Sequence, residues 1–144
     1  ELPYLEQMVK ESLRFLPSVW VFIKEPIEDV TVRGFHIPKG SPVVISPYLT
    51  HHDPRWYPSP ETFDPERFSK ERVGSIPNGA YIPFSGGARI CLGKSFAMME
   101  MRLILGSMLQ RLQPEVDPSY ELRAKAELSL HPDGPLPVVV QPRS

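Results

Sequence analysis

The sequence predicts a mixed α+β fold of two substantial helices, several short β strands and one long irregular segment. Three observations predict it. Apolar residues recur at helical spacing between Leu5 and Leu16, and a second helix-length apolar run extends from Leu92 to Leu109. Between these two stretches, short runs of β-branched residues alternate with proline-rich turns, which is typical of strands and loops.

The first helix is bounded by prolines. Pro3 suits a first helical turn, and Pro17 ends the periodic pattern. At about 3.6 residues per turn, Glu11 and Arg14 fall on the polar side of this helix. Their three-residue spacing by itself predicts an exposed ion pair worth about 0.2–0.5 kcal/mol.

The strands are expected to be short and mostly antiparallel. Residues 29–40 predict a hairpin that turns at the ArgGly pair, and residues 43–46 predict a third strand. Residues 128–130 and 138–140 predict a closing hairpin around the ProAspGlyPro sequence. Residues 53–83 hold six prolines and show no periodicity, so they predict an irregular segment that aromatic side chains keep ordered.

The composition is that of a globular protein or a piece of one. The chain is 41% hydrophobic and 23% charged, with a formal net charge of −1, so it carries no basic excess for binding nucleic acid. No apolar run reaches the roughly 20 residues of a membrane span. A single cysteine excludes an internal disulfide and suits a reducing compartment.

That cysteine, Cys91, is a candidate metal ligand. It lies between a glycine-rich loop and the second predicted helix, and a helix N-terminus favours a thiolate over a thiol. Gly86 and Gly87 let the backbone pass close under a flat group, and Arg89 is placed to hold an anion at the rim of that group. Taken alone, a lone cysteine is more often a small buried apolar residue.

The segment from Phe84 to Gly93, which we call the cysteine loop, resembles the FxxGxRxCxG signature of the cytochrome P450 haem-thiolate enzymes. All five fixed positions of that signature are filled, by Phe84, Gly87, Arg89, Cys91 and Gly93. Two further family signatures occur in the expected order. They are the ExxR of the K helix, read here as Glu11 to Arg14, and the sequence PheAspProGluArgPhe ending at Phe68.

The resemblance implies that this chain is the C-terminal, haem-binding portion of such a domain. Residues 1–144 would run from the K helix through short β strands, the meander, the cysteine loop and the L helix to a C-terminal β hairpin. The proline-rich residues 53–83 match the meander. The N-terminal part of the fold, including the oxygen-activating I helix, is expected to be absent.

The resemblance also assigns roles around the haem, an iron protoporphyrin IX. Cys91 would be the proximal iron ligand and the one catalytic residue in this chain, because its electron donation favours O–O cleavage. Phe84 would pack beside the sulfur, and Gly87 and Gly93 would allow close approach of the haem. Arg89 and Lys24 would each pair with a haem propionate, whereas Lys24 by itself reads equally well as a strand-edge lysine.

A buried scaffold is implied as well, in contrast to the exposed pair that spacing predicts. Glu11 and Arg14 would be locked to Arg67 in a network that braces the cysteine loop. Such a network is structural, and truncating one member would leave uncompensated buried charge.

Substrate contacts are implied in two places that would line the distal pocket. Their apolar character suggests an apolar organic substrate, although side chains of this kind are more often simply core. The residues are Val19, Trp20, Val21, Phe22 and Leu128.

Other polar residues have less specific expectations. Basic residues at Lys70, Arg72 and Lys94 could meet an acidic electron-transfer partner on the proximal face, although scattered lysines are more often a solvated surface. The adjacent histidines at 51 and 52 lack a third metal ligand at suitable spacing and are expected to be structural.

The implied activity is a monooxygenase, an oxidoreductase that inserts one oxygen atom of dioxygen into its substrate. Electrons would come from a ferredoxin or a flavoprotein reductase. Alternatives are peroxide-driven or rearrangement chemistry on the same haem-thiolate, and a non-catalytic fragment without a closed haem pocket. The resemblance of the cysteine loop and the ProAspGlyPro hairpin to bacterial members implies a soluble, cytoplasmic protein, although the expected N-terminal part could have carried a membrane anchor.

Overall fold

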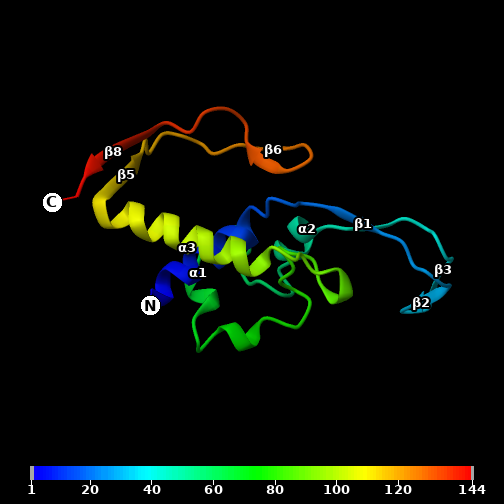
Figure 1. The fold of residues 1–144 in the computed structure, drawn as a ribbon. Coiled ribbons are helices and arrows are strands. Elements are labelled where there is room, and N and C mark those ends of the chain that lie inside the picture. The colour runs from blue at the N-terminus through cyan, green and yellow to red at the C-terminus, as the bar shows by residue number, and fades with distance from the viewer. Residues whose placement is uncertain (1, 144) are drawn as a thin grey trace.

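The computed structural model describes residues 2–143, and two helices form its centre (Figure 1). Helix α1 spans Pro3–Phe15 and helix α3 spans Lys94–Arg111. The two helices pack against each other, and α1 also packs against the short 3-10 helix η1, Pro65–Phe68. Helix α1 is therefore held between α3 and the meander.

Four short strands follow α1 and project away from the helices (Figure 1). Strand β1, Phe22–Lys24, pairs antiparallel with β4, Val43–Ile45. Strand β2, Val30–Val32, pairs antiparallel with β3, Phe35–Ile37. The β2–β3 turn is made by Arg33 and Gly34, both with positive φ, which matches the right-handed twist of a hairpin.

The segment between β4 and α3 is irregular and tied together by turns. Helix α2, Pro47–His51, begins at Ser46, whose hydroxyl accepts the Leu49 N–H at 3.2 Å. Beyond η1 come two further 3-10 turns, η2 at Val73–Ser75 and η3 at Gly87–Arg89.

The predicted C-terminal hairpin between residues 128–130 and 138–140 is wrong in its pairing. Strand β7, Leu130–Pro132, pairs with β6, Ala124–Ala126. Strand β8, Val138–Pro142, pairs with β5, Leu112–Val116, which continues directly from α3. Each of these two strands thus pairs with an earlier strand and not with the other.

The core is small and contains charged residues as well as apolar ones. Val9, Tyr57, Phe68 and Ala80 are buried, and so are polar side chains that hold α1 to the meander. By contrast, Gly106 is the one buried position of α3 among the described residues.

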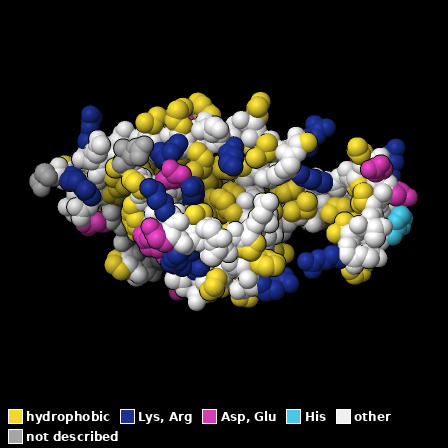
Figure 2. Space-filling model, turned by 90° about the horizontal axis from the view of Figure 1, so that it is seen from below, with side chains coloured by type: hydrophobic (Ala, Val, Ile, Leu, Met, Phe, Trp, Pro, Cys, Tyr) yellow, Lys and Arg dark blue, Asp and Glu magenta, His cyan; other side chains and the backbone are white. Residues whose placement is uncertain are grey.

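Apolar side chains also reach the surface. Figure 2 shows them between basic ones on one face, with a smaller lobe projecting at the side. No helix within residues 2–143 combines the length and apolar character that crossing a bilayer requires.

Candidate functional site

The cysteine loop is closed on itself and leads directly into α3. The Cys91 N–H donates to the Phe84 carbonyl at 2.9 Å, and the Cys91 carbonyl accepts the Lys94 N–H at 3.3 Å. Gly93 is the N-cap of α3. Cys91 is exposed, so its thiol is accessible on the surface of the chain rather than packed as a buried apolar residue.

Gly87 and Gly93 of this loop differ in why glycine is found there. Gly87 has a φ of +69°, a conformation in which a side chain would be strained. Gly93 has an ordinary φ of −79°, and a Cβ there would lie 3.9 Å from the Cys91 sulfur, at normal contact distance. The chain itself would therefore accept a side chain at Gly93, and the open space beside the thiol is available to a bound group.

An open hollow of about 620 Å³ lies between the cysteine loop and the strand segment that follows α1. Phe84, Arg89 and Cys91 line it from the loop, and Phe22 and Lys24 line it from β1. Two segments that are far apart in sequence thus line one space.

The two cations at this hollow are held differently. Lys24 is half-buried, donates from Nζ to the Gly86 carbonyl at 3.1 Å and lies 5.5 Å from the centre of the Phe22 ring. Arg89 is exposed and has no hydrogen-bond or ion-pair partner among residues 2–143. The hollow also has one carboxylate, that of Glu25, but its soft thiol donor, two cations and largely apolar walls suit a flat, apolar cofactor that carries a metal and peripheral anions.

The exposed ion pair predicted by the spacing of Glu11 and Arg14 is wrong, because both side chains are 0% exposed. The Arg14 guanidinium makes a two-point contact with the Glu11 carboxylate, at 2.7 and 2.8 Å. Arg67 lies beside them, with Nε 3.5 Å from Glu11 Oε1. The polar face of α1 is buried because the meander packs over it.

Both arginines also bind backbone carbonyls outside α1, and all of these except that of His51, in α2, belong to the meander. Arg14 donates to His51 O at 3.0 Å and to Thr62 O at 3.3 Å. Arg67 donates to Pro58 O at 2.7 Å and to Ser59 O at 2.8 Å. The network therefore fixes the meander on α1, and none of its described polar contacts reaches the cysteine loop directly.

The comparison that decides the family covers nearly the whole chain. The family model for cytochrome P450 matches residues 1–138. The chain belongs to the cytochrome P450 family.

Curated P450 proteins from animals and bacteria resemble it. Mus musculus cytochrome P450 3A16 is 42% identical over 99% of this chain and 29% of its own length. Putative cytochrome P450 132 of Mycobacterium bovis is 41% identical over 92% of this chain and 28% of its own length. This P450 chain thus spans less than a third of the length of these two relatives.

Solved P450 structures share its fold. Retinoic acid bound cyanobacterial CYP120A1 matches with a TM-score of 0.90 and 39% identity, over 98% of this chain and 33% of that one. A cytochrome P450 named CYP102L1 matches with a TM-score of 0.92 and 30% identity, over 99% of this chain and 32% of that one. The mixed helices and small sheets therefore correspond to part of a P450 fold.

The segments expected to contact substrate lie near each other in this P450 chain. Val19 joins Phe22 in lining the hollow, and Val21 is half-buried. Trp20 Nε1 donates to the Glu127 carbonyl at 2.8 Å, which ties this segment to the β6–β7 turn. Leu128, at the tip of that turn, is fully exposed.

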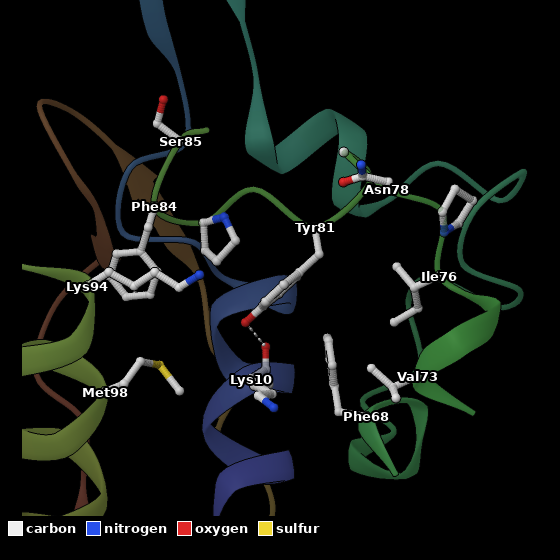
Figure 3. Close-up of a pocket in the computed structure, with 13 residues that line it drawn as sticks. Lys10, Phe68, Val73, Ile76, Asn78, Tyr81, Phe84, Ser85, Lys94 and Met98 are labelled. Carbon is white, nitrogen blue, oxygen red and sulfur yellow. Dashed lines mark hydrogen bonds between the residues drawn. The ribbon is translucent and has the colours of Figure 1, made fainter. Parts of the chain in front are cut away.

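The basic residues expected to meet a redox partner are not one patch of free cations. Arg72 is ion-paired with Asp64 at 2.9 Å, while Lys70 is exposed. Lys94 lines a second hollow of about 330 Å³ together with Lys10, between α1, α3 and the meander (Figure 3).

One structural residue lies much deeper than its sequence suggests. His51 is 0% exposed and contacts both α1 and the segment before the cysteine loop. The sequence offers no signal for this burial, because His51 and His52 look alike there and only one of them is buried.

Proposed function

We propose that residues 1–144 are the haem-binding portion of a P450 monooxygenase, with Cys91 as the iron ligand. The observation that carries the proposal is the exposed Cys91 thiol, which lines one hollow with two cations and apolar side chains. When bound there, haem would supply oxygen activation, so that one atom of dioxygen enters an organic substrate.

The residues of the chain would each have a defined task at this site. Cys91 would donate its thiolate to the iron from a position beside the N-terminus of α3, where the helix dipole favours negative charge. Arg89 and Lys24 would neutralise the haem propionates. Phe84 and Phe22 would exclude water from the sulfur side of the hollow.

The buried network would act as a scaffold for this site. Glu11, Arg14 and Arg67 hold the meander on α1, and the meander runs directly into the cysteine loop. We infer that the network braces the loop through the meander, since its own contacts are to meander carbonyls.

The substrate is proposed to be an apolar organic molecule. Val19 and Phe22 give the hollow an apolar wall, and a relative of 39% identity has been solved with retinoic acid, itself largely apolar. Electrons would come from a ferredoxin or flavoprotein reductase, as the reaction consumes two electrons for each oxygen atom inserted.

Replacing the proposed ligand tests this function. We expect Cys91→Ser to abolish the red-shifted, thiolate-type absorption band of the reduced, carbon monoxide-treated haem protein. The matched control is Ser95→Ala, four residues further on in α3, which should keep the band. A Cys91→Ser variant that retains the band would overturn the ligand assignment.

The proposed propionate contacts predict a graded effect on haem binding. Removing Arg89 as Arg89→Ala should weaken haem affinity about tenfold, the effect of losing one charge-assisted hydrogen bond. Lys24→Ala should act in the same direction, and Lys24→Arg should restore affinity because it keeps the charge. Haem titration followed by absorbance measures this, and unchanged affinity in both alanine variants would contradict the assignment.

The non-catalytic alternative has one observation in its favour. The hollow is open, and α3 exposes large apolar side chains such as Phe96 and Leu103, at 63% and 61%. If the 144-residue chain gives no thiolate-type band while a longer P450 polypeptide containing it does, the function belongs to that longer protein.

A further inference from the structure

His51 occupies a junction between α1, α2 and the end of the meander. It is the last residue of α2, and its side chain is completely buried. Its ring stacks on Tyr81, with centroids 5.4 Å apart and planes 27° apart, and it meets the Tyr57 ring edge-on at 6.3 Å. These aromatic contacts leave the imidazole one fixed orientation.

Both ring nitrogens of His51 have backbone partners. Nε2 lies 2.9 Å from the Ile82 nitrogen and accepts its N–H. Nε2 must therefore be unprotonated, which places the ring proton on Nδ1. Nδ1 lies 3.2 Å from the Arg14 carbonyl and donates to it. One neutral imidazole thus connects the end of α1 with the approach to the cysteine loop.

The electrostatic surroundings favour this neutral form. Burial lowers the pKa of His51 to about 4; the hydrogen bond to the Arg14 carbonyl opposes this shift, and the charge of the Arg14 guanidinium acts with it. The phenols that face the ring, Tyr57 and Tyr81, have pKa values raised by burial and stay uncharged. The Arg14 guanidinium donates to the His51 carbonyl at 3.0 Å and not to the ring.

The position of Ile82 gives this contact a consequence for Cys91. Ile82 is two residues before Phe84, and the Phe84 carbonyl is the acceptor of the Cys91 N–H. Tyr81, the residue before Ile82, is anchored to α1 through its hydroxyl, which donates to the Lys10 carbonyl at 3.0 Å (Figure 3). Tyr81 is therefore held directly by α1, and Ile82 is held by the His51 ring, which in turn contacts the end of α1.

We propose that His51 is a positioning residue for the cysteine loop, whose neutral imidazole holds the Ile82 amide and thereby sets the start of the loop that presents Cys91. The proposal deepens the proposed function and rests on it for the role of Cys91. It assigns to His51 a contact at the end of the meander, two residues before the cysteine loop, whereas the arginine network binds meander carbonyls no further along than Thr62.

The test uses the local stability of single amides. In His51→Phe, the ring keeps its stacking but loses both hydrogen bonds, so we expect the Ile82 and Cys91 amides to exchange with solvent about tenfold faster or more. Amides in the middle of α3 should be unchanged. In His51→Gln, which can both donate and accept, protection of Ile82 should be partly restored.

Matched and independent measurements keep the test decisive. His52→Gln is the control, because the His52 ring bonds only locally, with Nδ1 2.9 Å from the Tyr48 carbonyl. Unchanged Ile82 exchange in His51→Phe would overturn the proposal. If His51→Phe does not fold, nitrogen NMR of the unaltered protein can report which ring nitrogen of His51 carries the proton. A proton on Nε2 would exclude the proposed hydrogen bond from Ile82 and overturn the proposal.

These readouts separate the two proposals. Amide exchange and imidazole tautomer are measured without haem, so they stand even if Cys91→Ser shows that Cys91 is not the ligand. With haem bound, His51→Phe should also lower the fraction of protein that shows the thiolate-type band, and His51→Gln should recover part of it. A band unaffected in His51→Phe would show that His51 does not position Cys91.

Discussion

Replacing Arg14 by alanine is expected to lower the free energy of unfolding by about 3–5 kcal/mol, the effect of leaving a buried charge without its partner. The Glu11 carboxylate would lose its two-point contact and remain at 0% exposure, with Arg67 only at 3.5 Å. The His51 and Thr62 carbonyls would lose a donor at the same time. The loss should also prevent haem incorporation, because the meander would no longer be fixed on α1.

Urea unfolding of the unaltered protein and of Arg14→Ala measures this loss of stability. Arg102→Ala is the matched control, since Arg102 makes an exposed ion pair with Glu6 at 3.2 Å. That substitution should change stability by about 1 kcal/mol at most. Arg14→Lys should lie closer to Arg14→Ala than to the unaltered protein, because an ammonium cannot make the two-point contact. A loss in Arg14→Ala no larger than that in Arg102→Ala would show that the network is not the scaffold proposed here.

Acidification is expected to remove about 3 kcal/mol of stability through His51 alone. In the folded protein the pKa of His51 is about 4, compared with an ordinary value of 6.5. Above pH 6.5 the imidazole is neutral in both states. Between pH 6.5 and pH 4 the unfolded chain takes up a proton that the folded chain excludes, so stability falls as the pH falls. Below about pH 4 both states are protonated and this loss stops growing.

The measurement is the free energy of unfolding of the unaltered protein and of His51→Gln across this pH range. Carboxylates contribute equally to the unaltered protein and to His51→Gln, so the difference between the two curves isolates His51. His131→Gln is the control, since the His131 side chain is 41% exposed and lies at the surface near Glu127. Parallel pH curves for the unaltered protein and His51→Gln would contradict the burial of a neutral imidazole.

Local sequence predicted much of the secondary structure. Pro3 and Pro17 mark the ends of α1 because proline fits a first helical turn and cannot continue a helix. The ArgGly turn of β2–β3 follows from residues that adopt positive φ. The cysteine loop was recognisable because five fixed positions within ten residues hold the residue types of the family signature, each with a chemical reason.

Strand pairing needed the tertiary structure. The run at residues 138–140 is readable as a strand, but its partner β5 is 22 to 30 residues earlier and begins where α3 ends. The sequence of a short strand says little about which strand it will pair with. The partner depends on which strands the packing of the helices brings side by side. The predicted C-terminal hairpin failed for that reason.

By itself, then, the sequence determined the family signature, the two helices and the identity of the residue proposed to bind iron. For Glu11 and Arg14, helical spacing predicted an exposed pair and the family resemblance predicted a buried pair joined to Arg67, and the tertiary structure has the buried pair with Arg67 beside it. The tertiary structure alone decided that His51 rather than His52 reaches Ile82. The physical reason is that burial and hydrogen-bond partners depend on which segments pack over a residue. Helical spacing places Glu11 and Arg14 on a polar face, and only the packing of the meander turns that face inward.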